Sequence, residues 1–449
     1  MDSVIYKSES QLDKLQHQTF NFFRNEANPA NGLVADKTLP DGPAGIASTG
    51  FALSSYPIAV ERGFISRNDA TERILNTLRF FLNSRHGPEP EATGYHGFYY
   101  KFLDMNKGRR ARMSEISFLD SSILFAGALT VSAYFDRNDG REKEIRYLSD
   151  ELYRKADWSW ALNNGDRILH GWKPETGFEN YAWNGYDEGF LIYILGLGAP
   201  DFTLPQNSFT GWTAGYEWIN FYGHDYLYSA PLFVHQLPHC WIDFRGIRDE
   251  YMKKKNSDYF ENSKKATIVQ YRYAVENPGK YECYGKYFWG ITLSDGPGPL
   301  LTGIKGTDRE FLGFAKRGVP FGPDDGTVSP WSAVASIAFS PDLVIPAIEY
   351  LLHETDLNML NSYGFRSAFN PTFPHKPHNP HGWRSPYHLG INQGPAMMMI
   401  ENYRSGLIWN LLRDNSYIKA GLLKAGFTEG WLSEEKKEKS TIQYNHAGR

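Results

Sequence analysis

The stretch WNGYDEGFLIYILGLGAP, residues 183–200, changes from a polar and aromatic cluster into an almost wholly apolar run. The run indicates a buried segment, and Asp187 and Glu188 stand at its start. A carboxylate in such a place is costly unless it is solvated, paired or used in chemistry. Partial burial favours a protonated carboxyl group, which a general acid needs. The alternative is that both acids simply mark a helix N-terminus, where the helix dipole favours negative charge.

The composition is that of a globular protein and excludes several functions. Of 449 residues, 41% are apolar and 22% are charged. The net charge of −4 shows no long run of one sign, so we expect no nucleic-acid partner. No apolar run is long enough for a membrane span, and residues 1–20 lack the apolar core of a signal peptide. Cys240 and Cys283 form neither a disulfide framework nor a metal pattern.

The aromatic content is high, at 15%, with 12 Trp, 28 Tyr and 29 Phe. Many of these rings stand beside Gly, Asp, Asn or His rather than inside apolar runs. Aromatic faces next to hydrogen-bonding groups suit flat, hydroxyl-rich ligands such as sugars. The alternative is a large core that happens to be aromatic, which accounts for part of the excess.

Helical periodicity alternates along the chain with polar-aromatic loops. Capping residues and apolar spacing predict about ten to twelve helices. The clearest begins near Ser10, and others are expected at 46–63, 67–84, within 113–135, at 141–160, 263–275, 340–354 and 395–412. Strand signals are sparse, which predicts an all-α fold. No composition break marks a linker, so we expect one domain over residues 1–431, followed by a charged flexible tail at 432–449.

Several acids lie in polar-aromatic loops rather than on charged helix faces. They are Glu115, Asp120, Asp187, Glu188, Asp225, Asp243, Asp295, Asp324 and Asp325. Glycoside hydrolysis needs two carboxyl groups, one to protonate the leaving oxygen and one to activate water or attack directly. Ordinary turn chemistry is the alternative for the three that lie in Asp-Gly turns. Asp243 most simply pairs with Arg245.

Metal chemistry and other enzyme classes are not indicated. His235 and His239 have the spacing of zinc ligands on a helix, but Pro238 between them disrupts a regular helix. We therefore expect these histidines to form hydrogen bonds rather than to hold a metal. The chain has no nucleophile elbow, no Walker A sequence and no dinucleotide fingerprint after a strand.

Many ordered stretches together resemble a known family. They are GFALSSYPIAVERGFIS (50–66), KFLDMNKG (101–108), SEISFLDSSILFAGAL (114–129), GWKPETGF (171–178), the opening stretch, FVHQLPHCWIDFRG (233–246), DYFENSKKAT (258–267), WGITLSDGP (289–297), DDGTVSPWSAVASIAFSP (324–341), YGFRSAFNP (363–371) and GINQGPAMMMIENYRSGL (390–407). Their order and content resemble the bacterial glycoamylase-like domain, grouped with the β-1,2-glucanases of glycoside hydrolase family 144. The resemblance covers about residues 9–428.

The resemblance implies a fold and an activity. The expected fold is an (α/α)6 barrel, with an inner and an outer ring of helices and a cleft among the loops at one end. The expected reaction is inverting hydrolysis of β-1,2-glucan, which releases sophorose and short β-1,2-glucooligosaccharides without a cofactor. We expect endo action, and the alternative is release of disaccharide from chain ends. The partner is then an oligo- or polysaccharide. Family members are commonly exported, which would place the protein in the periplasm or outside the cell.

The resemblance also implies roles for single residues. Glu188 matches the family's general acid, and Glu115, with Asp120 close behind, is expected to supply the second carboxylate. The residues expected on the cleft side are Trp183, Tyr186, Asp187, His235, Gln236, Trp241, Arg245, Trp289, Asp295 and Asn392. The family often has Asp where Asn392 stands, and an amide cannot act as a base. This leaves open a carbohydrate-binding protein without catalysis, and the basic cluster of Arg109, Arg110 and Arg112 leaves open a different glycan.

Overall fold

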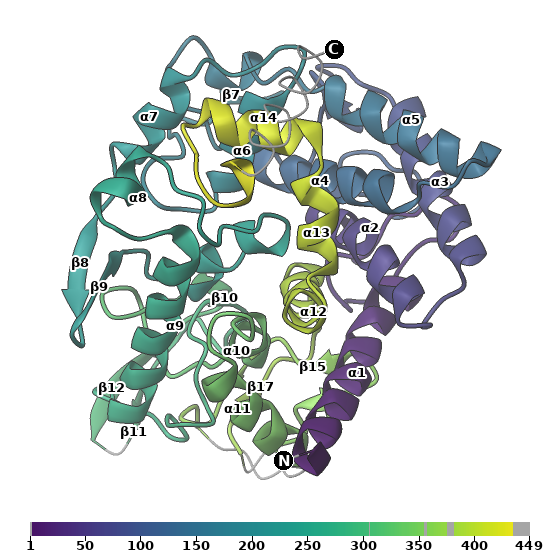
Figure 1. Ribbon diagram of the computed structural model, residues 1–449. Coiled ribbons are helices and arrows are strands. Elements are labelled where there is room, and N and C mark those ends of the chain that lie inside the picture. Colours follow the sequence, from purple (N-terminus) through teal and green to yellow (C-terminus); the bar gives the residue numbers. More distant parts are fainter. Residues whose placement is uncertain (1, 305, 354–356, 375–380, 434–449) are drawn as a thin grey trace, which may run out of the picture.

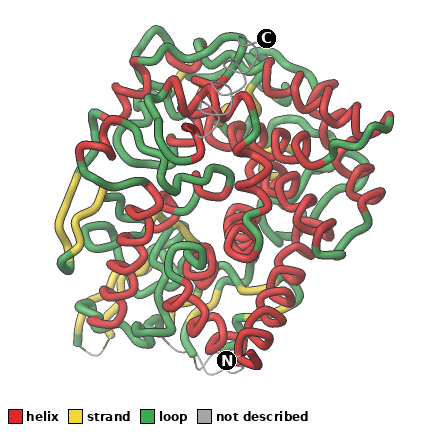
Figure 2. Tube along the Cα trace, in the orientation of Figure 1, coloured by secondary structure: helices red, strands yellow, loops and turns green. Residues whose placement is uncertain are grey.

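The computed structural model describes residues 2–304, 306–353, 357–374 and 381–433, and it is rich in helix, as predicted (Figures 1 and 2). The longer helices are α1 (Asp2–Asn25), α2 (Ile46–Glu61), α3 (Arg67–Asn83), α4 (Phe118–Tyr134), α5 (Gly140–Arg154), α6 (Phe190–Gly198), α9 (Tyr259–Glu276), α11 (Pro341–His353), α12 (Gly390–Arg404) and α14 (Ser416–Lys424). Shorter ones are α7 (Asn207–Thr213), α8 (Glu250–Lys254), α10 (Pro330–Ala335) and α13 (Leu407–Arg413), with the 3₁₀ turns η1 (Trp160–Leu162), η2 (Leu232–His235) and η3 (Pro238–Cys240). Among the described helices, none is long and apolar enough to cross a membrane.

Short antiparallel ladders brace the loops between the helices. Each strand has two to five residues. The pairs are β1 (Ala44–Gly45) with β4 (Phe102–Leu103), β2 (Gly94–Tyr95) with β3 (Phe98–Tyr99), β5 (Ile116–Ser117) with β6 (Gly171–Lys173), β6 with β7 (Gly177–Phe178), β8 (Trp218–Phe221) with β9 (His224–Leu227), β10 (Leu293–Ser294) with β13 (Ala315–Lys316), β11 (Leu300–Ile304) with β12 (Thr307–Phe311), β14 (Leu360–Asn361) with β15 (Gly364–Phe365), and β16 (Phe369–Asn370) with β17 (Trp383–Arg384).

The helices α2, α4, α6, α10 and α12 form the centre of the molecule and are buried almost all round. All nine residues of α6 are buried, as the apolar run at residues 190–199 predicts. Helices α2 and α4 approach so closely that a Cβ atom on Gly50 would lie 2.5 Å from the Ile123 carbonyl oxygen. A Cβ atom on Gly127 would lie 2.3 Å from the Gly50 carbonyl oxygen, so only glycine fits at this crossing.

Amphipathic helices cover this centre. Helix α3 buries Ile74, Leu78 and Phe81 on one face. Ser66 caps the start of this helix, because the Asp69 amide donates to Ser66 Oγ at 3.1 Å. Other helix boundaries differ from the prediction. Ser10 lies inside α1 rather than at its start.

The predicted helix at residues 395–412 is two helices in the structure. Helix α12 ends at Arg404, and α13 begins at Leu407. Between them Gly406 has a φ of +69°, which is left-handed backbone that ends a helix. The predicted helix at 141–160 ends earlier, at Arg154.

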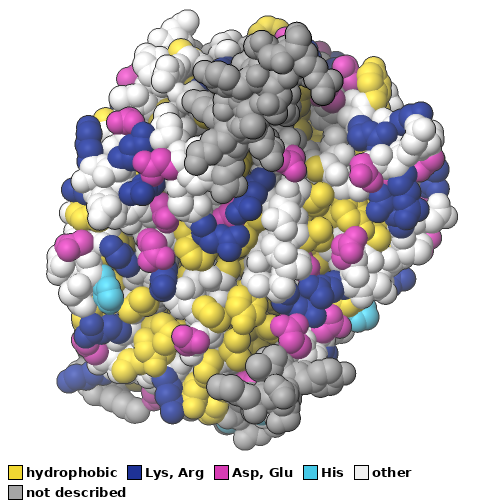
Figure 3. Space-filling model, viewed as in Figure 1, with side chains coloured by type: hydrophobic (Ala, Val, Ile, Leu, Met, Phe, Trp, Pro, Cys, Tyr) yellow, Lys and Arg dark blue, Asp and Glu magenta, His cyan; other side chains and the backbone are white. Residues whose placement is uncertain are grey.

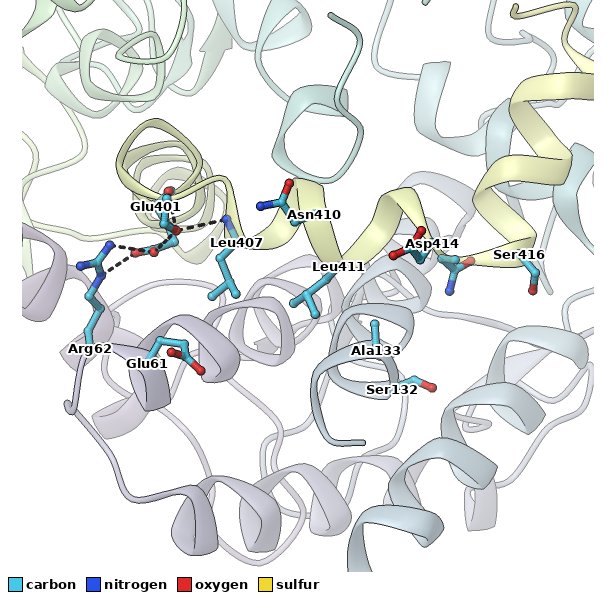
Figure 4. Close-up of a pocket in the computed structure, with 12 residues that line it drawn as sticks. Glu61, Arg62, Ser132, Ala133, Glu401, Leu407, Asn410, Leu411, Asp414 and Ser416 are labelled. Carbon is cyan, nitrogen blue, oxygen red and sulfur yellow. Dashed lines mark hydrogen bonds and ion pairs between the residues drawn. The ribbon is translucent and has the colours of Figure 1, made fainter. Parts of the chain in front are cut away.

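Helices α2, α4 and α12 begin at the same end of the molecule, which we call the carboxylate end. The loops before them are joined by backbone hydrogen bonds from Ile46 to Lys101, from Lys101 to Glu115, and from Gly390 to Asp36, at 2.9 to 3.1 Å. The opposite end holds the C-terminal residues of the same helices. Glu61, Ala133 and Glu401 line a pocket of about 740 Å³ there (Figure 4).

Both ends of the described chain lie at the end opposite the carboxylate end. Arg404, the last residue of α12, forms ion pairs with Glu9 and Asp13 in the first half of α1 at 3.0 and 3.1 Å. The indole of Trp431 donates to the carbonyl oxygen of Asp243, which follows η3. Of the predicted tail, residues 432–433 are described and residues 434–449 lie outside the described part of the chain.

Candidate active site

Glu188 lies just before α6 at the carboxylate end, and only 3% of its surface is exposed. Lys316 Nζ on β13 forms an ion pair with Glu188 Oε1 at 2.7 Å. The neighbouring Asp187 fixes the turn, because it accepts hydrogen bonds from the amides of Asn184 and Gly189 and from the indole of Trp212. Burial raises the pKa of Asp187 to about 6. Asp187 therefore shapes the loop that presents Glu188.

Aromatic rings form a wall beside Glu188. The rings of Trp183 and His170 stack with centroids 3.8 Å apart and planes at 13°, and His170 also contacts Tyr181. Lys316 Nζ lies 5.7 Å from the centroid of the Trp183 ring. Burial, helped by the charge of Lys316, lowers the pKa of His170 to about 4, so this imidazole is neutral at pH 7. Among the described residues, the indole N–H of Trp183 has no hydrogen-bond partner.

A second group of carboxylates surrounds Lys101 at the same end. Lys101 Nζ lies 3.9 Å from Glu115 Oε1, and the charge of Asp120 is the largest of the influences that raise the pKa of Lys101. Asp120 accepts a hydrogen bond from Ser117 Oγ at 2.5 Å. Burial raises the pKa of Asp120 despite that bond and the charge of Lys101.

Asp36 and Asp295 complete this second group. Burial, with the charges of Asp120 and Asp295, raises the pKa of Asp36 to about 6. Asp295 is nearly buried and accepts a hydrogen bond from Ser385 Oγ at 2.8 Å. The β10–β13 ladder connects the two carboxylate groups, because Leu293 pairs with Lys316 while Asp295 directly follows β10. The same ladder therefore places Lys316 beside Glu188 and Asp295 near Asp36.

Three residues expected on the cleft side lie elsewhere in the structure. Gln236 is fully buried and donates to the Ser332 carbonyl oxygen in α10 and to Oγ of Ser336, the residue that follows this helix. Trp241 is fully buried and donates to Ser54 Oγ in α2. We assign Gln236 and Trp241 to the packing of the centre.

Arg245 is the third of these residues. It pairs with Asp243 at 2.7 and 2.8 Å, as predicted, and its guanidinium lies 4.5 Å from the ring centroid of Trp409 on α13. Asp243 also pairs with Arg413. This places Arg245 at the end opposite Glu188, so it cannot contact a sugar bound beside Glu188.

The remaining predicted residues are buried near the carboxylate end or beneath it. His235 packs edge-on against Tyr186 with ring centroids 5.1 Å apart, and burial lowers its pKa to about 4. Asn392 is in the first turn of α12 and donates to Ser367 Oγ at 2.7 Å. Trp289 is 1% exposed and contacts Tyr271 edge-on. These residues support the site rather than line an open surface.

The structure also brings in residues that the sequence did not single out as site residues: Asp36, Lys101, His170, Tyr181, Lys316 and Ser385. Two arginines of the basic cluster pair with different glutamates. Arg110 is nearly buried and pairs with Glu175 in the turn between β6 and β7 at 2.6 Å, whereas Arg109 pairs with Glu91 on the surface at 3.3 Å. In the part of the chain that the structure describes, no group of three or more His, Cys, Asp or Glu residues is arranged to hold a metal ion.

Comparison with known proteins gives a consistent set of relatives. The family model "Glycoamylase: Putative glucoamylase" matches residues 180–416. A curated Parabacteroides distasonis protein, "Exo beta-1,2-glucooligosaccharide sophorohydrolase (non-reducing end)", is 28% identical over 93% of this chain. This chain spans only 58% of that relative's length.

Solved structures agree over almost the whole chain. A Bacteroides uniformis structure with the same glucoamylase description is 29% identical and superposes with a TM-score of 0.83, covering 95% of this chain and 98% of its own. An endo-beta-1,2-glucanase from Chitinophaga pinensis, in complex with sophorotriose and glucose, is 26% identical with a TM-score of 0.82, covering 95% and 99%. The chain is a helix-rich protein of the glucanase and glucoamylase fold, and it belongs to the glycoamylase family.

Proposed function

We propose that this protein is a glycoside hydrolase that cleaves β-1,2-glucan. The observation that carries the proposal is the buried Glu188, held beside the Trp183–His170 wall and at the same end of the molecule as a second group of carboxylates. Two separate carboxyl groups beside aromatic rings are what glycoside hydrolysis needs. The activities of the relatives from Parabacteroides distasonis and Chitinophaga pinensis support β-1,2-glucan as the substrate.

We further propose that the fold is an (α/α)6 barrel in one domain over residues 1–431. The inner ring would consist of α2, α4, α6, the η2–η3 segment, α10 and α12, and the outer ring would include α1, α3, α5, α9 and α11. The burial of the first set and the amphipathic character of the second support this arrangement. The η2–η3 segment would replace a regular inner helix because Pro238 interrupts it.

In this proposal Glu188 is the general acid and protonates the glycosidic oxygen as the bond breaks. Asp120 is our choice for the base that activates water from the opposite face of the sugar, which inverts the anomeric centre. We choose Asp120 over Glu115 because Asp120 is buried, whereas the Glu115 side chain is 25% exposed and pairs with Lys101. Trp183 and Tyr181 would contact sugar rings, and Glu115 and Lys101 would contact hydroxyl groups.

Product analysis tests the proposal. The protein is incubated with linear β-1,2-glucan and, in parallel, with β-1,3-, β-1,4- and α-1,4-glucans, and the products are followed by chromatography and anomeric NMR. We expect products from β-1,2-glucan alone, appearing first as α-anomers. A ladder of early products indicates endo action, and sophorose alone indicates release from chain ends. Hydrolysis of another glucan with β-1,2-glucan untouched contradicts the proposed substrate.

A second candidate function is carbohydrate binding without catalysis, and Asn392 is the observation that favours it. Its amide is buried and donates to Ser367 Oγ, so this position cannot accept a proton from water. Calorimetric binding of β-1,2-glucooligosaccharides with no product after long incubation supports this second function. Gain of hydrolysis in Asn392→Asp would then show that a missing carboxylate is the cause.

A further inference from the structure

The ion pair between Glu188 and Lys316 conflicts with the role of a general acid. A general acid must carry a proton when the leaving group departs. An ammonium 2.7 Å from the carboxylate favours the charged form instead. The pair is also needed, because a buried carboxylate without a partner is costly. The sugar-free site is therefore arranged for stability and not for proton donation.

The backbone that carries Lys316 is firmly anchored. The adjacent Arg317 is fully buried, pairs with both carboxylate oxygens of Asp325 at 2.7 and 2.9 Å, and donates to the carbonyl oxygens of Ser294 and Leu312 at 3.0 Å. The β10–β13 ladder holds the register of this strand. These contacts fix where the Lys316 side chain begins.

The end of the Lys316 side chain has more freedom than its backbone. The side chain is 52% exposed, whereas that of Glu188 is 4% exposed. Lysine has a flexible four-carbon stem with a compact charge at its end. In the ion-paired position Nζ also lies 5.7 Å from the centroid of the Trp183 ring, at the edge of the space proposed for the sugar. The ammonium can therefore leave Glu188 without any movement of the strand.

We propose that Lys316 is a positioning residue whose ammonium neutralises Glu188 in the empty site and is displaced by the incoming sugar, so that binding and protonation of Glu188 occur together. The inference rests on the proposed function and deepens it. Two other titratable groups interact with Glu188: His170, which is neutral, and Asp187, which is held in its turn. Neither replaces the positive charge when Lys316 moves away.

The first test measures proton uptake on binding, which does not require catalysis. Sophorose is titrated into the protein by calorimetry at one pH in two buffers that differ in ionisation enthalpy. We expect the wild type to take up close to one proton per bound sugar. Lys316→Met keeps the length of the side chain and removes its charge, so sugar binding no longer takes a cation away from Glu188 and proton uptake falls. Equal uptake by both proteins overturns the proposal.

The second test uses the pH dependence of hydrolysis. The profile of kcat/KM reports the free enzyme, and that of kcat reports the complex. In the wild type we expect the alkaline limb of the kcat/KM profile to lie at lower pH than the alkaline limb of the kcat profile. In Lys316→Met the kcat/KM limb moves to higher pH by about 1 to 3 units and coincides with the kcat limb. Lys316→Arg keeps the charge and should keep the wild-type profile.

A matched control separates this effect from the loss of any ion pair. Lys253 and Glu250 form a pair of the same 2.7 Å length on the surface of α8. Lys253→Met should leave proton uptake and both pH profiles unchanged. If no glucan is hydrolysed, the proposed function fails. The calorimetric test still decides whether Lys316 is displaced by the sugar. A kcat/KM limb that does not move in Lys316→Met contradicts the role of Lys316 and leaves the hydrolase proposal intact.

Discussion

At the scale of single residues, Glu188 gives the most direct prediction. Glu188→Gln keeps the shape of the side chain but cannot donate a proton as an acid. We expect kcat on β-1,2-glucan to fall by about 100-fold or more, with little change in thermal stability. The measurement is the initial rate of reducing-end release. Glu250→Gln, an exposed glutamate on α8, is the control and should retain full activity. Loss of only a few-fold in Glu188→Gln excludes Glu188 as the acid.

The second carboxylate is distinguished by a pair of variants. Asp120→Asn removes a buried carboxylate, and we expect it to lower kcat by about 100-fold or more if it activates water. Glu115→Gln changes a partly exposed group that pairs with Lys101, so we expect a higher KM with kcat nearly unchanged. Steady-state kinetics on β-1,2-glucooligosaccharides separate the two effects. The reverse result would make Glu115 the base, which is the role the family resemblance implies.

The sequence located some of these residues and missed others for a physical reason. The change from polar to apolar at residues 183–200 placed Glu188 at the start of a buried helix, because burial of that run is dictated locally. Lys316 lies on the two-residue strand β13 and Asp36 lies in a loop, neither of which shows periodicity in sequence. Their neighbours Glu188 and Asp295 are far away in the chain. Such contacts depend on how the loops fold over the helix ends. Local patterns do not contain that information.

At the scale of elements, the crossing of α2 and α4 makes a prediction about stability. An alanine at Gly50 would place its Cβ atom 2.5 Å from the Ile123 carbonyl oxygen, and backbone cannot rotate away as a side chain can. We expect Gly50→Ala to lower the free energy of unfolding by about 1 to 3 kcal/mol. Urea denaturation measures the loss. At Gly140, the first residue of α5, a Cβ atom would meet no described atom within 4 Å, so Gly140→Ala should be neutral.

The segment that contains η2 and η3 differs from its predicted role. The family resemblance implies that Gln236 and Trp241 lie on the cleft side. In the structure this segment forms the two turns η2 and η3, and the polar groups of both residues bond to other central helices. A buried polar group with a good partner and a ligand-binding group look the same in sequence. Only the packing of α2 and α10 against this segment separates them.

At the scale of the whole molecule, buried histidines make stability depend on pH. Burial lowers the pKa of five histidines to about 4 or below, from 6.5; they are His86, His170, His235, His239 and His388. Between these values the unfolded chain binds more protons than the folded one, so stability falls as the pH drops from 6.5 toward 4. For the fully buried His235 the full effect is about 3 kcal/mol.

Buried carboxyl groups act in the opposite direction. The raised pKa of Asp36 and of Asp187, about 6 in both cases, makes the folded state hold protons that the unfolded chain has lost. Stability from these two groups is present at low pH and is lost as the pH rises through 6. The pKa of Asp120, Asp249 and Asp324 is raised as well, whereas the pKa of Glu142, Asp243 and Asp325 is lowered, so these two sets of carboxyl groups offset each other. The five histidines then decide the sign, and we expect the melting temperature to decrease from pH 6.5 to pH 4. Calorimetric melting across this range is the measurement, and a rise in melting temperature toward pH 4 would contradict the balance.

The position of the chain ends has a practical consequence. The start of α1 and residues 425–433 lie at the end opposite Glu188 and Asp120. A protein attached to a bead, a surface or another domain through either of these ends would present its carboxylate end to the solution. A long polymer could then reach the site from outside while the anchored side stays against its support. Attachment through the loop that carries Lys316 would instead turn the site toward the support.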